Sequence, residues 1–315
     1  MVTDLVGALR PLSCCPHVVL VLGKGGVGKT TISIALARSL SRLGRTLLLS
    51  LDPARHLAKY LGIAGEGPEE VSGGLYVQQI SVEREVEAVT SKYAELLREL
   101  MPSLSVYNLD SVADVVRYSP GVEEEVFLRA LSRAFRSDYS YVVVDTPPTG
   151  VTLRTLALPN LYLAWLDRLI EVRERIVSLR YVIAKTLRRE AEMRDRALER
   201  LYEMREEFQL LRDLLASHER TSYVIVATPE PLPMYELRES FSFLTQRVRN
   251  RPKLLVLNKV LPDSVARELG VLEFQRGSLE ELASYGVRYA VVEHLGRPTE
   301  SLADIEELEG RVRVF

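Results

Sequence analysis

The sequence is poor in cysteine, and its two cysteines, Cys14 and Cys15, are neighbours in the chain. Adjacent cysteines rarely form a disulfide because its geometry would be strained, and no CxxC spacing occurs. No apolar run reaches the roughly 18 to 20 residues that a membrane-spanning helix needs, and the first residues lack the layout of a secretory signal. These absences exclude a disulfide scaffold and a CxxC metal site, and they predict a cytoplasmic protein.

An excess of positive charge is also missing. The chain has 41 Lys and Arg against 43 Asp and Glu, a net charge of -2, whereas a nucleic-acid-binding domain is normally basic. Nucleic acid is therefore not an expected partner.

Asn and Gln are scarce beside Arg, Glu, Leu and Val, a bias typical of heat-adapted proteins. With 315 residues, of which 47% are hydrophobic, the chain is long enough for a large buried core.

Apolar runs alternate with helical patterns, which predicts an α/β fold with a mostly parallel sheet flanked by helices. Runs such as VVLVL and YVVVD are apolar throughout, as expected of strands buried on both faces. The expected strands cover residues 17–22, 45–51, 75–80, 141–145, 223–227, 253–257 and 289–292, with a short last strand near Val312.

One interval between strands is too long for a single crossover helix. No glycine or proline lies between Pro159 and Pro229, and apolar residues recur there at three- and four-residue steps. We expect two long helices joined by a turn near residues 188–194. Together with a helix at 82–100 they predict a helical subdomain, formed by about 82–135 and 160–218, inserted in a single domain of residues 1–315.

The apolar side chains of these helices allow two interpretations: a core packed between helices, or a groove that binds another apolar helix. The residues concerned are Trp165, Leu166, Leu169, Ile170, Ile176, Val177 and Ile183 upstream, and Ala197, Leu201, Met204, Phe208, Leu211 and Leu215 downstream.

The strongest motif is GKGGVGKT at residues 23–30, which matches the P-loop pattern G-x-x-x-x-G-K-[ST]. It lies where such a loop must, between the apolar strand HVVLVL and the helical run ISIALARSLSRL. Lys29 is expected to reach the β- and γ-phosphates, and the Thr30 hydroxyl to bind Mg²⁺. Backbone N–H groups are expected to hold the phosphates, helped by the positive end of the helix. The predicted nucleotide-binding residues of the loop are Gly25, Gly26, Val27, Gly28, Lys29, Thr30 and Thr31, and the predicted ligands are ATP or ADP with Mg²⁺.

Two acidic residues follow apolar strands. Asp145 ends YVVVD and is expected to hold Mg²⁺ directly or through a water. Asp52 follows TLLLSL and is expected at the carboxyl ends of the strands, where open α/β sheets bind ligands. Thr30, Asp52 and Asp145 are therefore the predicted metal ligands. Gly150 is expected in a loop that senses the γ-phosphate.

Four segments resemble a known family. GKGGVGKTT, LDPARHLAKYLG, VVVDTPPTGVTLRTLALP and LVLNKV are similar to the deviant P-loop, the two switches and the base-recognition strand of the ArsA/TRC (GET) ATPases. That family contains the arsenite-pump ATPase and the ATPase that targets tail-anchored membrane proteins, and the similarity runs from about His17 to Leu261. It implies a P-loop NTPase fold with a helical subdomain, and Mg²⁺-dependent ATP hydrolysis. It also implies a hydrophobic client helix and a membrane receptor.

The resemblance gives the first lysine of the loop a role. In this class the residue at the position of Lys24 reaches across a dimer interface to the nucleotide of the other subunit, where its charge stabilises the transition state. Lys24, Lys29, Asp52 and Asp145 are then the implied catalytic residues. Because this chain has one such loop, the implied partner is a second copy.

The resemblance also addresses the base of the nucleotide. Asn258 in LNKV is implied to bind the adenine edge, since its amide offers a donor and an acceptor. Residues 291–302 are implied to lie beside the base. No Asp follows Lys259 where a guanine-reading motif would carry it, so adenine is expected.

The sequence departs from the family in its first switch. Lys59 occupies the position of an aspartate that orients the attacking water, and a lysine cannot accept a hydrogen bond from that water. Hydrolysis is therefore expected to be slow, or to use another group such as His56. One alternative is an ATP-binding switch with little hydrolysis. Another is an arsenical-pump ATPase, against which the missing arsenite-binding cysteines argue. The zinc-binding CxxC of the targeting dimer is also absent.

Overall fold

The structure is a computed structural model that describes residues 6, 7, 9, 16–51, 57, 61–63, 67–100, 121–187, 195–297, 299 and 301–315, with the backbone alone for 92–100. The chain divides into two compact units. Unit 1 comprises Met1–Val82, Arg129–Arg154 and Leu215–Phe315, and unit 2 comprises Glu83–Leu128 and Thr155–Leu214. Some residues singled out in the sequence lie outside the described residues, namely Cys14, Cys15, Asp52, His56, Lys59 and the predicted turn at 188–194.

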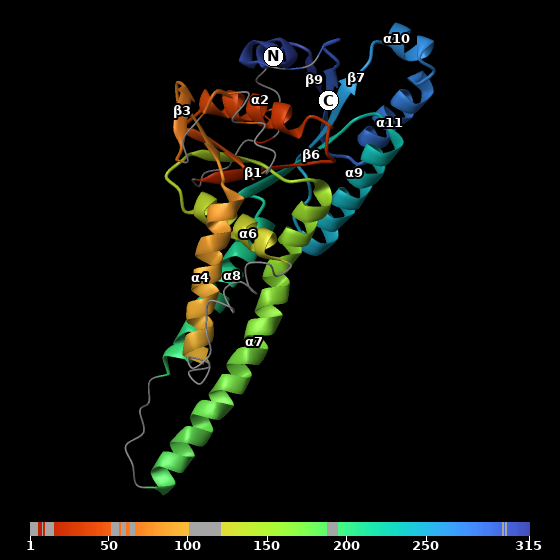
Figure 1. Ribbon diagram of the computed structural model, residues 1–315. Coiled ribbons are helices and arrows are strands. Elements are labelled where there is room, and N and C mark those ends of the chain that lie inside the picture. Colours follow the sequence, from red (N-terminus) through yellow and green to blue (C-terminus); the bar gives the residue numbers. More distant parts are fainter. Residues whose placement is uncertain are drawn as a thin grey trace. The chain divides into compact units, whose positions relative to one another are not determined.

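The strands of unit 1 form one sheet with the order β3-β4-β2-β5-β1-β6-β7-β8-β9 (Figure 1). The central strands pair in parallel, and the two edge strands β3 and β9 are antiparallel to their neighbours. The strands are β1 (His17–Leu22), β2 (Thr46–Ser50), β3 (Glu69–Ser72), β4 (Leu75–Gln79), β5 (Tyr141–Asp145), β6 (Thr221–Ala227), β7 (Leu254–Val260), β8 (Arg288–Glu293) and β9 (Val312–Val314). The predicted α/β class with a mostly parallel sheet is confirmed.

The sheet differs from the sequence-based prediction by two residues or more in three places. Strand β6 begins at Thr221, two residues before its predicted start, and β7 continues to Val260 rather than ending at 257. Strand β3 was not predicted, because its sequence EEVS is short and half polar. Such a strand is formed by pairing with β4 at the sheet edge and has little apolar signal of its own.

Helices of unit 1 cover this sheet. They are α2 (Lys29–Ser41), α9 (Pro231–Phe243), the π-helical turn η2 (Leu244–Val248), α10 (Asp263–Glu268), α11 (Leu272–Ser284) and α12 (Leu302–Glu309). Buried side chains of α2 and α12, such as Leu36 and Ile305, pack in one core with Val19 and Val143 of the central strands. Burying a large apolar side chain contributes about 1.5–3 kcal/mol to the free energy of unfolding, so this core is the main source of stability.

Unit 2 is helical in its described part (Figure 1). It contains most of α4 (Val82–Leu100), α7 (Thr149–Thr186) and α8 (Arg196–Ala216), and the first half of α6 (Val122–Phe135). Helices α7 and α8 pack antiparallel: Arg173 binds Asp195 at 2.9 Å, and farther back along α7 the rings of Tyr162 and Phe208 lie 4.6 Å apart. No helix in the described ranges is long and apolar enough to cross a lipid bilayer.

The apolar side chains of these two helices divide between the two interpretations. On α8 the stripe is core, since Ala197, Leu201, Phe208 and Leu211 are buried. On α7 the upstream set is split. Leu166 and Ile170 are buried, whereas the remaining members include exposed side chains, namely Trp165, Leu169, Ile176 and Ile183.

Gly150 was predicted to lie in a loop, and this placement was wrong, whereas its role in sensing the γ-phosphate stays a prediction. It belongs to the first turn of α7, which begins at Thr149 and continues through Pro159. Proline lacks an N–H and normally interrupts a helix, and this is why the sequence favoured a helix that starts after it.

The buried histidine His17 makes folding dependent on pH. It is fully buried at the start of β1, where Nδ1 meets the Glu219 carbonyl and Nε2 meets the Ser222 hydroxyl, each at 2.7 Å. Burial lowers the pKa of His17 to about 4 from its usual 6.5. The folded state resists protonation of His17. The contribution of neutral His17 to the free energy of unfolding is therefore complete above pH 6.5 and is lost as the pH falls towards 4.

We expect His17 to remove about 2.5 kcal/mol of unfolding free energy between pH 7.5 and pH 4.5. Urea unfolding at both pH values, with wild type and His17→Asn, measures this amount as the difference between the two pH dependences. Equal pH dependences for the two proteins would show that His17 is not the group responsible.

Candidate functional site

The loop at residues 23–28 connects β1 to α2 and places the lysines of the motif. Lys29 opens α2 and is only 6% exposed, and its Nζ donates to the Lys24 carbonyl oxygen at 3.2 Å. Gly25 and Gly26 are exposed, and Lys24 is half-buried. The loop therefore curls around the Lys29 amine at the start of a helix, the arrangement in which backbone N–H groups bind phosphate.

Two glycines of the loop are required by their surroundings. At Gly23, with φ of 154°, a Cβ would collide with the Val226 carbonyl oxygen of β6. At Gly28, with φ of 93°, it would collide with the side-chain amide of Asn258. The sequence predicts glycines here because side chains would block the phosphates. At these two positions the crowding comes from neighbouring strands of the protein itself.

Asp145 ends β5 beside the start of α2. It is 1% exposed, and its two carboxylate oxygens accept hydrogen bonds from Thr30 Oγ1 at 2.8 Å and Ser33 Oγ at 3.2 Å. The sequence predicted Thr30 and Asp145 as partners in one site, and the structure brings them together. Ser33 was missed, although its place three residues after Thr30 puts both hydroxyls on one helix face.

This pair fits Mg²⁺. Magnesium prefers oxygen ligands in an octahedron at about 2.0–2.1 Å, so that neighbouring ligand oxygens are about 2.9 Å apart. The Thr30 and Asp145 oxygens are 2.8 Å apart. Within the described ranges no group of three His, Cys, Asp or Glu side chains is placed to hold a metal. Among the described residues, Thr30 and Asp145 would hold such a metal together with phosphate or water, whereas Asp52, the third predicted ligand, lies outside them.

The segment after Asp145 is tied to β1 and then begins α7. The Thr146 hydroxyl donates to the Val21 carbonyl at 2.7 Å, and the Thr152 hydroxyl donates to the Pro147 carbonyl at 2.9 Å. The buried hydroxyl of Thr149 has no hydrogen-bond partner in the described part of the chain. Buried hydroxyls are normally paired, so this one has an unused donor that a bound water would satisfy.

Asn258 of β7 lies against the loop. It is 4% exposed, its Nδ2 donates to the Val27 carbonyl at 2.8 Å, and its Oδ1 accepts from the Lys259 N–H at 2.9 Å. The implied role of Asn258 in binding adenine stays a prediction. The amide has one more N–H and one more lone pair for a base, since these two hydrogen bonds use half of its capacity.

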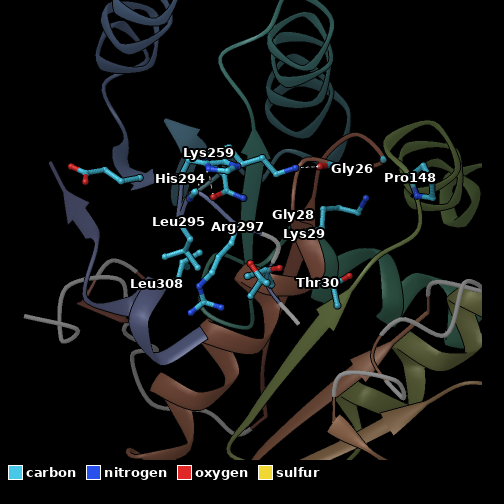
Figure 2. Close-up of a pocket in the computed structure, with 16 residues that line it drawn as sticks. Gly26, Gly28, Lys29, Thr30, Pro148, Lys259, His294, Leu295, Arg297 and Leu308 are labelled. Carbon is cyan, nitrogen blue, oxygen red and sulfur yellow. Dashed lines mark hydrogen bonds between the residues drawn. The ribbon is translucent and has the colours of Figure 1, made fainter. Parts of the chain in front are cut away.

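A cleft of about 790 Å³ opens beside the loop (Figure 2). The loop side includes Gly26, Lys29 and Thr30, and the opposite wall carries His294, Leu295 and Arg297. Of the predicted binding residues, those that line it are Gly25, Gly26, Gly28, Lys29, Thr30, Thr31 and Asn258. Residues of the predicted base-side segment 291–302 therefore share one cleft with the phosphate loop, at a volume suited to a small-molecule ligand.

The cleft wall formed by His294, Leu295 and Arg297 is connected to α12 by ion pairs. Arg297 is paired with Asp304 and, at 2.9 Å, with Glu307. Ser301 caps the helix in a capping box with Asp304, and Arg38 of α2 binds Glu309 at 3.3 Å. The wall and the helix that follows the P-loop are thus connected by ion pairs.

Comparisons with known proteins identify the family of the chain. The family described as "Anion-transporting ATPase" matches residues 16–285. The chain is 32% identical to "Putative arsenical pump-driving ATPase 2" of Aquifex aeolicus, over 84% of this chain and 87% of that protein. It is 28% identical to "ATPase GET3B" of Arabidopsis thaliana, over 77% of this chain and 64% of that protein. It is also 25% identical to "ATPase ASNA1 homolog 1" of Paramecium tetraurelia, over 78% and 75% of the two chains. With a P-loop, a strand-end aspartate and a ligand-sized cleft in one unit, the chain belongs to the ArsA family of anion-transporting ATPases.

Proposed function

We propose that this ATPase works as a Mg²⁺-dependent homodimer whose bound nucleotide controls the binding of an apolar client helix to unit 2. The observation that best supports a helical client is an apolar stripe exposed along α7. The stripe consists of Leu161, Trp165, Leu169, Val172, Ile176, Leu179 and Ile183, which are between 37% and 68% exposed.

The stripe has the spacing of a helix-binding surface. Its members recur every three or four residues, the period that places side chains on one helix face. A different face of α7, with Leu163, Leu166 and Ile170, is buried. Contiguous exposed apolar surface marks interaction sites, so we expect the stripe to bind a partner.

The length of the stripe supports a membrane-protein segment as that partner. From Leu161 to Ile183 a helix extends about 33 Å at roughly 1.5 Å per residue, which exceeds the hydrocarbon thickness of about 30 Å that a spanning helix must cross. An apolar helix of membrane-spanning length therefore fits along it. The resemblance to the tail-anchored targeting ATPases supports the same client and a membrane receptor.

The proposed chemistry uses the site described above. Lys29 and the loop N–H groups bind the β- and γ-phosphates. Thr30 and Asp145, with Asp52 as the third predicted ligand, would hold Mg²⁺, which would supply positive charge to the phosphoryl group. Lys24 of the partner copy supplies the remaining positive charge when the dimer closes. Hydrolysis thereby depends on the contact between two subunits.

The client is tested by Val172→Asp/Leu179→Asp, a double variant in the stripe whose side chains are 56% and 62% exposed. We expect a tail-anchored protein co-expressed with the wild type to co-purify with it, and the double variant to retain less than about a tenth as much, because two carboxylates must be desolvated on binding. ATP hydrolysis without client is expected to stay within about twofold of wild type.

Tyr181→Asp is the matched control, since Tyr181 is 49% exposed on α7 but lies outside the stripe. It is expected to retain the client as the wild type does. Failure of the wild type to retain any tail-anchored protein with a non-hydrolysable ATP analogue would refute the client, as would equal retention by the double variant.

A second candidate is an arsenical-pump ATPase, which the 32% identity to the relative of that name favours. Stimulation of ATP hydrolysis by arsenite would distinguish it, because the proposed client-binding ATPase has no reason to respond to arsenite.

A further inference from the structure

Two residues at the end of β7 donate hydrogen bonds to successive carbonyl groups of the phosphate loop. Asn258 Nδ2 donates to the Val27 oxygen at 2.8 Å, and Lys259 Nζ donates to the Gly26 oxygen at 2.7 Å. Figure 2 shows the Lys259 side chain extended towards Gly26, with this hydrogen bond dashed. The two residues form a brace between the sheet and the loop, here named the β7 brace.

Lys259 reaches the loop because its backbone is distorted. Its φ is 59°, in the left-handed region that side-chain-bearing residues avoid at a cost of about 1–2 kcal/mol. The pairing of β7 with β8 shifts register between Leu257 and Val260. The Lys259 N–H donates to the Asn258 side chain, which offsets part of the cost. Non-glycine residues held in such conformations cluster at functional sites.

Val27 is buried in the core, but the Gly25–Gly26 turn before it has few other constraints among the described residues. A Cβ added at Gly25 or Gly26 would meet no atom within 4 Å, so side-chain packing does not restrain this turn. The Lys24 carbonyl is held by Lys29 Nζ at 3.2 Å. If Lys29 binds the triphosphate as proposed, its amine turns to the phosphates and this contact weakens. The Lys259 hydrogen bond to Gly26 then holds the segment.

We propose that Lys259 is a positioning residue that holds Gly26, and through it the backbone of Lys24, in the orientation that hydrolysis requires. This inference rests on the proposed role of Lys24 in the transition state. Lys259 acts through the loop, and Lys29, Thr30 and the loop N–H groups carry ground-state binding of the nucleotide. Loss of the Lys259 amine is therefore expected to lower kcat while KM for ATP changes little.

The test compares Lys259→Met with Lys259→Arg, which retains a donor, and with Arg276→Met, which removes an exposed cation of α11 in the same unit. Lys259→Met is expected to lower kcat about tenfold with KM within about threefold, whereas Lys259→Arg recovers most of kcat. Hydrogen exchange of the peptide covering residues 23–28 is expected to accelerate severalfold in Lys259→Met alone. Arg276→Met is expected to match the wild type in each measurement.

A double-mutant cycle with Lys24→Met shows whether Lys259 acts through Lys24. In the Lys24→Met background, Lys259→Met is expected to lower kcat by less than about twofold, because the group that it positions is already gone. A rise in KM above about tenfold with kcat unchanged would overturn the inference, since Lys259 would then contact the nucleotide directly. Wild-type hydrogen exchange in Lys259→Met would overturn it as well.

These outcomes are separate from those of the proposed function. If Lys24→Met alone leaves kcat unchanged, the proposed catalytic role of Lys24 fails. Hydrogen exchange still decides then whether Lys259 holds the loop. If Lys24→Met lowers kcat and Lys259→Met does not, the positioning role fails and the proposed function stands.

Discussion

Lys24→Met is expected to lower kcat for ATP hydrolysis by about 1,000-fold, the order of effect that a cation supplied by a partner subunit has on phosphoryl transfer. KM is expected to stay within about threefold, because Lys29 and the loop N–H groups remain in place to bind the nucleotide. Lys29 is buried beside the loop, whereas Lys24 is half-buried at its entrance. Steady-state kinetics at saturating Mg²⁺ measure both parameters.

Lys185→Met is the matched control for this loss of charge, since Lys185 is an exposed lysine of α7 far along the chain from the loop. It is expected to hydrolyse ATP at the wild-type rate. A Lys24→Met protein with normal kcat would contradict a catalytic lysine at this position. A rise in KM alone would assign Lys24 to ordinary ground-state binding.

Asp145→Asn is expected to raise the Mg²⁺ concentration needed for half-maximal activity by more than about tenfold and to lower kcat by about 100-fold. The carboxylate accepts from Thr30 and Ser33, and an amide replaces one of its acceptor oxygens with a donor. The metal thus loses a charged ligand. A Mg²⁺ titration of activity measures the first effect, and binding of a fluorescent ATP analogue in EDTA shows whether the nucleotide still binds.

Ser33→Ala provides a graded comparison, because it removes one donor to Asp145 and leaves the carboxylate. Its half-saturating Mg²⁺ concentration is expected to lie between those of the wild type and Asp145→Asn. An equal half-saturating Mg²⁺ concentration in Ser33→Ala and Asp145→Asn would mean that the carboxylate acts only by holding α2 in position. An unchanged Mg²⁺ dependence in Asp145→Asn would remove the metal from this position altogether.

The central fold was predictable because its strands carry their signal locally. Strand β1 is buried from end to end and β5 at every residue after Tyr141, and the predicted bounds of both were correct. Strand β3 depends on pairing with β4, and α7 continues through Pro159 although proline normally ends a helix. Local sequence could not show either, because an edge strand depends on its partner and a proline normally marks a helix boundary.

The site was predictable to the extent that its motif has a fixed geometry. The P-loop pattern predicted Thr30, and the end of an apolar strand predicted Asp145, as members of one site. In the structure the two side chains are hydrogen-bonded. The β7 brace was not predicted. The left-handed backbone of Lys259 has no sequence signature, since glycine and asparagine are the residues that normally favour it. Its reach to Gly26 depends on the register shift between β7 and β8.

The most direct test of the account mixes Lys24→Met with Asp145→Asn. Each variant alone is nearly inactive, but a mixed dimer has one complete site: the Lys24→Met subunit keeps its own Asp145 and receives Lys24 from its partner. At equal amounts half of randomly formed dimers are mixed, so activity is expected to recover to about a quarter of the wild-type value per chain. Activity at every ratio equal to the average of the two separate variants would contradict a lysine shared between two copies.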